Sequence, residues 1–366
     1  MRNRSSRGGT GSTALGRRDF LRSAAIGGAA VALAPSLSSC MLSGQGQSSG
    51  GGGSLAPVRF SFAPDPVWDY MLQQGVQEKF EKEHGLVIET SSTWDEFAYF
   101  AGGHGDIVST ASYELPLLEE ETGIKTVTFG KYNLLRITPI VKTDKPYQTL
   151  ADIPKGSRIG VPSAVSSTLV WGMFARELHD LDFQVGSGDY ELVVEDHFVM
   201  AEHVDRGDIE AALVIPEAAI SLLRQDRLRV LYDNKLPYQI YGEVRGSEHR
   251  GVMGNMFTAT EEWFENNREQ AALFLAMWEE GIKLWESDRT QIIRDFPQHF
   301  AVEEEADIQA MDDYLSEHDW FVDTVYLDQD WIEGETSLYD FMKDSGFMEE
   351  DAPVPRYEAV DPPELG

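Results

Sequence analysis

The chain has 366 residues, of which 42% are hydrophobic and 11% aromatic, so it can bury a sizeable core and is not a disordered or fibrous polymer. Thirty Lys and Arg residues against 62 Asp and Glu residues give a formal net charge of −32, which argues against the broad phosphate contacts of nucleic-acid binding. The single cysteine, Cys40, excludes an intrachain disulfide framework and a cysteine-rich metal site. At about 100–200 residues per domain, the length predicts two domains, or one large domain with an appendage.

The first 39 residues have the composition of an export signal. They contain six arginines and one acidic residue, and the uncharged apolar run 24–37 is 14 residues long, where a membrane-spanning helix needs about 20. The preceding segment 16–22, GRRDFLR, resembles a twin-arginine signal, which a receptor reads. We therefore expect residues 1–39 to be a twin-arginine signal peptide.

Cys40 ends a segment, LSSC, that is similar to a prokaryotic lipobox. In a lipobox the cysteine is diacylated and becomes the new N-terminus, and two acyl chains suffice for stable anchoring. The alternative, a small residue in an ordinary cleavage region, fits a sole cysteine at this position less well. Residues 40–56 are expected to be a Gly/Ser-rich tether, which places the mature chain at the outer face of the cytoplasmic membrane.

The negative charge is spread along the whole chain, which has only ten lysines. At about 1 M salt the Debye length is only ~3 Å, so the self-repulsion of such a chain is screened. The acidity therefore indicates adaptation to molar salt, and a haloarchaeal source is expected. The alternative is an acid-rich protein from a low-salt organism.

From Pro57 onward, short apolar runs alternate with helical patterns, which is typical of α/β architecture. In the first part of the chain the expected strands are 58–62, 86–88, 107–110 and 134–141. The expected helices there are 66–84, a short one opened by a capping box at 93–96, and 113–122. After a punctuated segment at 144–156, strands are expected at 158–162, 190–194 and 209–215, and helices at 166–178 and 199–206.

The last third of the chain is expected to be mainly helical. A strand at 256–260 leads into a long helix, 261–286, along which Phe274, Trp278, Ile282 and Trp285 form a buried stripe. Further helices are expected near 303–316 and 337–346. Because no strand–helix alternation resumes there, we expect these C-terminal helices to pack on the first lobe.

Motifs for catalysis or metal binding are scarce. The sequence has no GxSxG elbow, HExxH pair or phosphate-binding glycine loop. Its eight histidines are scattered, and the acidic segment 328–333 lacks the pattern of an EF-hand. No catalytic residue, metal site or cofactor is therefore expected.

Three segments carry a resemblance to a known family: 146–156 (PYQTLADIPKG), 158–163 (RIGVPS) and 207–217 (GDIEAALVIPE). They are similar to ABC-importer solute-binding proteins of the nitrate/sulfonate/taurine and thiamine-pyrimidine-precursor group. The resemblance implies the type II periplasmic-binding architecture, with two doubly wound α/β sheets and a ligand cleft between the lobes. It implies a discontinuous lobe 1, residues 57–143 with 246–366, and a lobe 2 of residues 144–245.

The resemblance and the physics of open α/β sheets together place the ligand at strand C-termini and helix N-termini that face the cleft. Serines there can equally be helix caps, aromatic residues can be core, and acidic residues can lie on the surface. The candidate ligand-binding residues are Asp65, Trp68, Trp94, Ser109, Thr110, Ser112, Tyr113, Ser163, Ser166, Ser167 and Glu217.

Ligand identity stays open at this stage. A sulfonate or nitrate needs helix N-termini and an arginine, and no arginine adjoins the predicted loops. A small aromatic or zwitterionic solute, held by aromatic residues and a carboxylate, is slightly favoured. The resemblance implies a monomeric binding protein, not an enzyme, that delivers a solute to an ABC permease and its ATPase. The alternatives are a secreted enzyme on the same fold and a ligand sensor for a membrane signalling partner.

Overall fold

The computed structural model describes residues 55–94, 96–246 and 248–365. The predictions for the signal peptide, for Cys40 and for most of the tether lie outside this part of the chain. Residues 53–366 form one unit by their internal contacts. Within the described ranges, no helix is both long and apolar enough to cross a bilayer.

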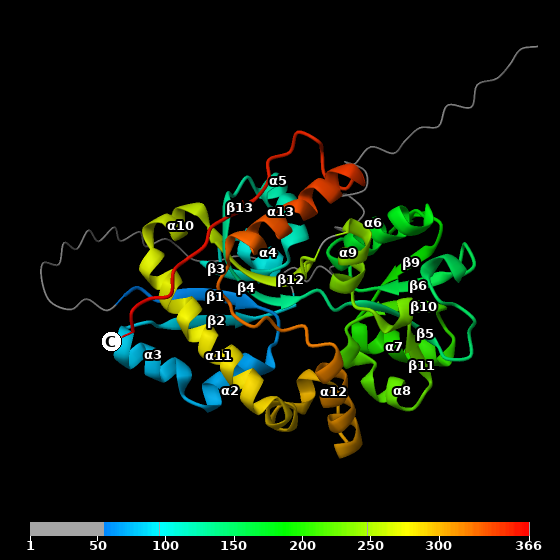
Figure 1. Ribbon diagram of the computed structural model, residues 1–366, viewed down its shortest axis with the longest axis horizontal. Coiled ribbons are helices and arrows are strands. Elements are labelled where there is room, and N and C mark those ends of the chain that lie inside the picture. Colours follow the sequence, from blue (N-terminus) through cyan, green and yellow to red (C-terminus); the bar gives the residue numbers. More distant parts are fainter. Residues whose placement is uncertain (1–54, 95, 247, 366) are drawn as a thin grey trace, which may run out of the picture. The chain divides into compact units, whose positions relative to one another are not determined.

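The first sheet, with the helices around it, forms lobe 1 (Figure 1). Strand β1 is parallel to β2 and β3, whereas β12 is antiparallel to β3 and β4. Since β12 and β13 come from late in the sequence, the sheet is built from two separate parts of the chain. In spatial order the described strands are β13 (Arg356–Tyr357), β4 (Thr126–Leu134), β12 (Met253–Thr260), β3 (Ile107–Thr110), β1 (Val58–Phe62) and β2 (Ile88–Ser92).

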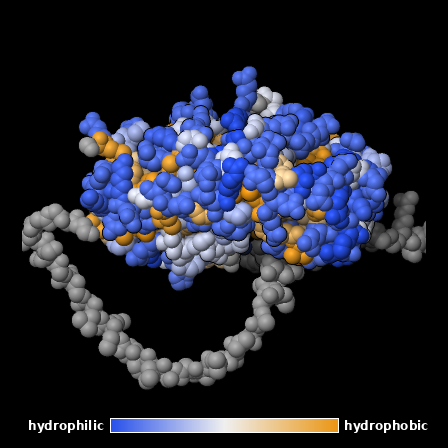
Figure 2. Space-filling view, turned by 90° about the horizontal axis from the view of Figure 1, so that it is seen from below, coloured by the Kyte–Doolittle hydropathy of each residue, from blue (hydrophilic) through white to orange (hydrophobic). Residues whose placement is uncertain are grey.

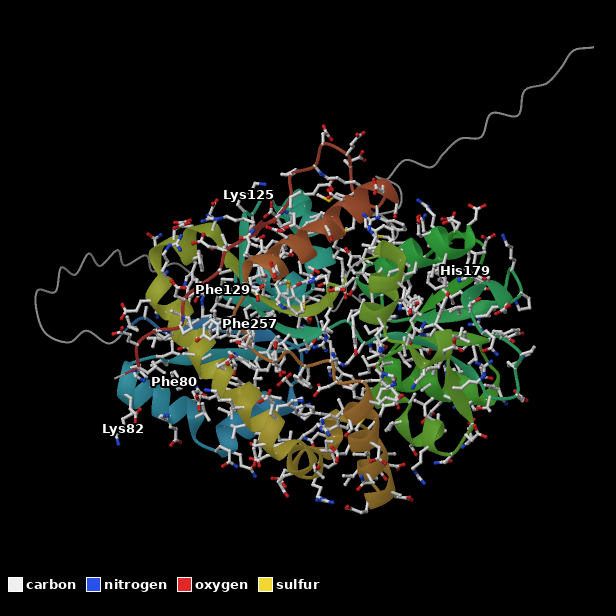
Figure 3. All side chains as sticks on the ribbon, viewed as in Figure 1. Phe80, Lys82, Lys125, Phe129, His179 and Phe257 are labelled. Carbon is white, nitrogen blue, oxygen red and sulfur yellow. The ribbon has the colours of Figure 1, made fainter. Side chains whose placement is uncertain are left out.

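An aromatic core holds lobe 1 together. Phe274 of the long helix α11 contacts Phe60 of β1 and Phe257 of β12, with ring centroids 5.0 and 5.1 Å apart. The predicted stripe is confirmed, because Phe274, Trp278, Ile282 and Trp285 are all buried. Figure 3 shows Phe129 and Phe257 in the interior of this lobe and Lys82 and Lys125 at its periphery. Its helices include α2 (Pro66–Gln73), α3 (Val76–His84), α4 (Glu96–Ala101), α5 (Leu115–Thr122), α10 (Glu261–Asn266) and α11 (Arg268–Asp295).

The second sheet forms lobe 2, the green part of Figure 1. Strand β10 is parallel to β6 and antiparallel to β5, and Trp171 and Phe174 are fully buried in its core. In spatial order the described strands are β11 (Leu228–Val230), β5 (Thr138–Lys142), β10 (Ala211–Val214), β6 (Arg158–Val161) and β9 (Glu191–Val194). The helices here include α6 (Ser167–His179), α7 (His197–Arg206), α8 (Ile220–Arg224) and α9 (Pro237–Arg245), and a short hairpin pairs β7 (Phe183–Gln184) with β8 (Ser187–Gly188).

The predicted single strand 134–141 is wrong. Strand β4 ends at Leu134 in the first sheet and β5 begins at Thr138 in the second, so residues 135–137 cross between the lobes. The predicted lobe boundary at 143/144 is therefore late by one strand. The run 134–141, LLRITPIV, is mostly apolar on both sides of the crossing, so hydrophobic periodicity does not reveal where the chain leaves one sheet for the other.

Two predicted helices are interrupted. The helix expected over 66–84 breaks at Gly75, which adopts a left-handed conformation with φ 71° and separates α2 from α3. Leu72 is 45% exposed while Phe80 is 1% exposed, so the apolar residues of the two helices do not form one continuous buried face. The long C-terminal helix breaks at Asn267, between α10 and α11.

Two helices follow α11, and both contact lobe 2 as well as lobe 1. Helix α12 (Glu305–Glu317) packs against α11, as expected, and also against α8. Helix α13 (Gln329–Asp344) contacts lobe 1 through Tyr339, whose hydroxyl donates to the backbone oxygen of Ser112. On lobe 2, its Phe341 stacks on Phe174. The C-terminal helices therefore join the two lobes.

Candidate functional site

The C-terminal ends of strands from both sheets lie near the segment that crosses between the lobes. Val214, at the end of β10, pairs with Thr138, at the start of β5, so the residues after β10 lie beside the crossing segment 135–137. There, Nε of Arg136 donates to Oε1 of Glu217 at 2.7 Å. The Arg136 guanidinium also lies over the ring of Trp320, 5.2 Å from its centroid.

Arg136 is close to ionisable groups of both lobes. Burial raises the pKa values of Asp65, Tyr113 and Tyr132 in lobe 1, and the positive charge of Arg136 partly offsets the rise at each. In lobe 2, the pKa of His197 is lowered to about 4, mainly by burial and in smaller part by the positive charge of Arg136. One arginine on the crossing segment therefore acts on side chains from both sides of the molecule.

Asp65 caps helix α2 at the end of β1. Its Oδ1 accepts from the backbone nitrogen of Trp68 at 2.8 Å and its Oδ2 from the hydroxyl of Tyr132 at 2.7 Å. Both carboxylate oxygens are thus engaged within lobe 1. The capping alternative accounts for the contacts of this candidate residue.

Three candidate residues carry buried polar atoms without a partner among the described residues. They are Oγ of Ser112, which follows β3, Oγ of Ser167, which opens α6, and Oε2 of Glu217. Each of the three residues is less than 5% exposed. A buried polar atom without a hydrogen bond costs about 1–3 kcal/mol, so such atoms at element ends indicate a place for a polar ligand.

A hydrogen bond connects the two lobes close to these atoms. The phenol of Tyr113 has a pKa raised by burial, and a side-chain hydrogen bond with Ser166 of lobe 2 partly offsets the rise. Ser166 has φ 61°, an outlier for a residue with a side chain. Its loop is bonded internally, because Ser163 Oγ donates to the oxygen of Val165 at 2.5 Å and Thr168 Oγ1 to the oxygen of Ser163 at 2.7 Å.

The remaining candidates are packed in the core, bonded locally or exposed. Trp68 is 4% exposed and stacks on Trp278 inside lobe 1, whereas Trp94, just after β2, is 59% exposed. Thr110 Oγ1 donates to Oε2 of Glu114 at 2.8 Å and so supports the turn after β3. Ser109 is buried in β3, opposite Phe257.

No protein-family model and no curated protein matches the chain. Among solved structures, it is similar to an alkanesulfonate-binding protein of Xanthomonas axonopodis, with TM-score 0.63, 14% identity and coverage of 84% of this chain and 99% of that one. It is similar to an aliphatic sulphonate-binding protein of Escherichia coli, with TM-score 0.63, 16% identity and coverage of 83% and 93%. A Candida albicans protein with the generic periplasmic binding protein fold gives TM-score 0.60, 12% identity and coverage of 85% and 99%.

The chain has the two-lobed periplasmic-binding-protein fold. In this fold the candidate site around Arg136 lies where the chain passes between the lobes. Sequence reasoning missed Arg136, because the run containing it was assigned to one continuous strand, and it also missed Tyr132 and His197, which lie outside that run. A single arginine inside the apolar run LLRITPIV was the signal that could have found it, since an unpaired charge is rare in a buried strand.

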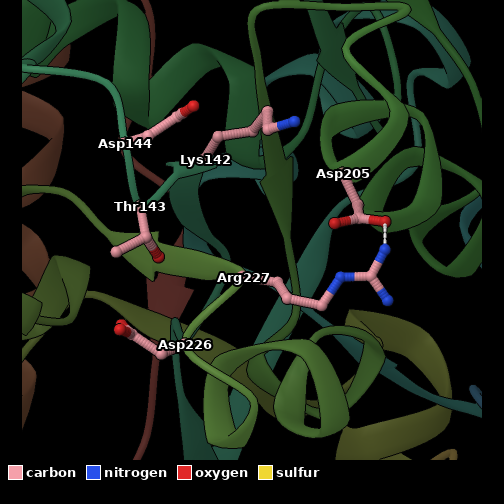
Figure 4. Close-up of a pocket in the computed structure, with 6 residues that line it drawn as sticks. All are labelled: Lys142, Thr143, Asp144, Asp205, Asp226 and Arg227. Atoms are coloured by element: carbon pink, nitrogen blue, oxygen red, sulfur yellow. Dashed lines mark hydrogen bonds and ion pairs between the residues drawn. The ribbon is translucent and has the colours of Figure 1, made fainter.

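The binding-protein fold also carries a surface pocket away from this site (Figure 4). It has a volume of about 410 Å³ and lies near Lys142, at the opposite end of β5 from Arg136. In it, Arg227 pairs with Asp205. No group of three or more His, Cys, Asp or Glu side chains within the described ranges is arranged to hold a metal ion.

Proposed function

We propose that the chain is an extracytoplasmic solute-binding protein that closes its two lobes on a small molecule and delivers it to an ABC permease and its ATPase. The observation that carries this proposal is the meeting of strand ends from both sheets around Arg136. Glu217 is bonded to Arg136, and among the described residues one of its oxygens and the hydroxyls of Ser112 and Ser167, which follow a strand of lobe 1 and open a helix of lobe 2, have no partner. A polar solute bound between the lobes would supply those partners.

The export and anchoring of the chain belong to the same proposal. The twin-arginine segment would export a folded chain, and diacylated Cys40 would hold it at the outer face of the cytoplasmic membrane as a monomer. The tether would leave the lobes free to reach the permease. Replacement of Cys40 by Ser is expected to release the chain from the membrane.

The candidate solutes are sulfonates, nitrate and pyrimidine-precursor-like compounds. Two structural neighbours are named for alkanesulfonate and sulphonate binding, which supports the inclusion of sulfonates. Arg136, which is bonded to Glu217, supports an anionic solute, whereas the sequence alone pointed to no arginine beside the predicted loops. Solutes with an acidic group therefore come first in any screen.

The test is a thermal-shift screen of the full chain in detergent at about 2 M KCl. The compounds are anions, sulfonates, pyrimidines, flavins and amino compounds. The expected result is a saturable rise in melting temperature with one solute class and no chemical conversion of it. Turnover of a compound, or the absence of any shift, would contradict the proposal.

Two serine variants sharpen this test. Ser112→Ala and Ser167→Ala should each weaken binding by about ten-fold, because a hydrogen bond to the solute is lost, while the melting temperature of the free protein is unchanged or higher. Ser61→Ala is the matched control, since Ser61 Oγ is also buried and has no partner among the described residues, but lies next to Gly105 within lobe 1.

A further inference from the structure

The Arg136–Glu217 pair has hydrogen-bonding capacity left on both partners. One hydrogen bond joins Nε to Oε1, and within the described ranges neither the two Nη atoms nor Oε2 make another. A guanidinium carries five N–H donors, and a carboxylate accepts at both oxygens. One ion pair therefore offers four N–H donors and one carboxylate oxygen side by side.

The surroundings hold this pair in place. Glu217 follows β10 and is 4% exposed, and the side chain of Arg136 is 20% exposed and rests on the Trp320 ring. Tyr314 of α12 is near as well, because burial and then the charge of Glu217 raise its pKa, and its hydroxyl has no partner among the described side chains. Two groups of opposite charge are therefore presented in a preformed arrangement.

The two halves of the pair require different partners. The Nη atoms suit an anionic group, which a guanidinium binds through two parallel hydrogen bonds. Oε2 of Glu217 repels a second anionic oxygen and accepts only from a donor such as an amine or amidine. A purely anionic solute would satisfy Arg136 and leave Oε2 unpaired, and a purely cationic one would do the reverse.

We propose that the Arg136–Glu217 pair selects a zwitterionic solute, with its acidic group on the Nη atoms of Arg136 and its N–H-bearing cationic group on Oε2 of Glu217. This inference rests on the proposed function and narrows its substrate class. It makes Glu217 a specificity-determining residue, since Arg136 alone would accept a simple anion.

The test measures calorimetric binding of matched probes to the full chain at about 2 M KCl. The zwitterions are 2-aminoethanesulfonate and a series of amino carboxylates with increasing spacing between the two charges. The single-charge partners are ethanesulfonate, propanoate and ethylammonium. The best zwitterion is expected to bind about ten-fold or more tightly than either single-charge analogue, because both ends find a partner.

Variants at the pair give the sharper result. Glu217→Gln should weaken binding of the zwitterion by about ten-fold or more, while binding of the matched anion is unchanged or tighter. Arg136→Gln should weaken both. Glu210→Gln is the control: Glu210 precedes β10, at the other end from Glu217, and accepts from Lys145 at 2.7 Å. It should leave the zwitterion-to-anion ratio unchanged. If Arg136→Gln does not fold, Arg136→Lys replaces it in the test, because lysine keeps the positive charge but cannot make the two parallel hydrogen bonds of a guanidinium.

The outcomes separate this inference from the function beneath it. If the single-charge anion binds as tightly as the zwitterion, or if Glu217→Gln leaves the ratio unchanged, the inference fails. It also fails if only an uncharged or purely anionic compound from the wider screen binds, although the proposed function then stands. If no compound binds at all, both fail.

Discussion

His197 is a buried titratable residue at the start of α7, on the lobe 2 side of the site. The backbone nitrogen of Ile215 donates to its Nδ1 at 3.4 Å, which requires an unprotonated nitrogen there. Burial is the main reason that its pKa falls from 6.5 to about 4. The folded protein therefore holds this imidazole neutral down to acidic pH.

This pKa shift makes stability depend on pH. Between pH 6.5 and about 4 the unfolded chain binds a proton at His197 that the folded chain does not, so stability is lost as the pH falls through that interval. We expect wild type to lose about 2 kcal/mol more than His197→Gln over this range, because the variant has no such group. Urea unfolding at several pH values measures the difference, and parallel curves for the two proteins would contradict it.

At the scale of residues, sequence reasoning found the ends of elements but not the crossing segment. Ser112, Ser167 and Glu217 could be predicted from the sequence, because each follows a recognisable strand. Arg136 could not, because no turn residue marks the passage from β4 to β5. Arg136 and Glu217 form an ion pair although they are 81 positions apart in the sequence. No local sequence pattern predicts such a contact.

Two C-terminal helices act as connections between the lobes. Asp307 of α12 is 5% exposed, and its Oδ1 accepts from Nε of Arg224, on α8 of lobe 2, at 2.6 Å. On α13, Ser337 bonds the hydroxyl of Tyr241 from α9 at 2.9 Å. Separation of the lobes along these contacts would expose a carboxylate and a phenol that are now paired.

The Arg224–Asp307 pair gives a prediction for α12. Arg224→Ala leaves the Asp307 carboxylate buried with no cation on it, so the free energy of unfolding should fall by about 2–3 kcal/mol. Arg294→Ala is the matched control: Arg294 lies on α11 and pairs at 2.5 Å with Glu305, which is also on α12, and both side chains are exposed. That change should cost less than about 1 kcal/mol. Equal losses in urea unfolding would show that the buried pair has no special role.

At the scale of elements, the alternation of strands and helices could largely be predicted from the sequence. The position of a buried strand that carries polar residues could not. The strands near 107–110, 158–162 and 190–194 and the aromatic stripe of α11 agree with expectation. Strand β4 was missed except at its end, because it carries Lys131, whose ammonium is buried over the Trp331 ring at 4.2 Å. A lysine covered by a helix 200 residues later is indistinguishable in sequence from a surface residue.

At the scale of the whole molecule, the excess of acidic residues dominates. Figure 2 shows a face made mostly of hydrophilic residues, with hydrophobic ones scattered among them. Arginines bridge several acids at once where they occur: Arg356 pairs with Glu261, Glu265 and Glu358, and Arg268 with the last two. With 30 basic against 62 acidic side chains, such networks leave most of the negative charge uncompensated.

This imbalance predicts a stability that depends strongly on salt. Between about 0.1 M and about 1 M KCl the Debye length falls from ~10 Å to ~3 Å, so repulsion among surface carboxylates is progressively screened. The free energy of unfolding should therefore rise steeply over this range and level off above it. Urea titrations at fixed KCl concentrations measure the curve.

Sucrose is the control that distinguishes charge screening by KCl from a general increase in the stability of the hydrophobic core. An excluded osmolyte favours burial in any protein but carries no charge, so sucrose at matched osmolality should stabilise this chain much less than KCl does. An equal effect of sucrose, or a linear rise with KCl that never levels, would contradict the electrostatic origin. A strong and saturating rise of stability with KCl would instead show that the chain folds fully only where salt screens its carboxylates. That condition is the one expected for a halophilic source.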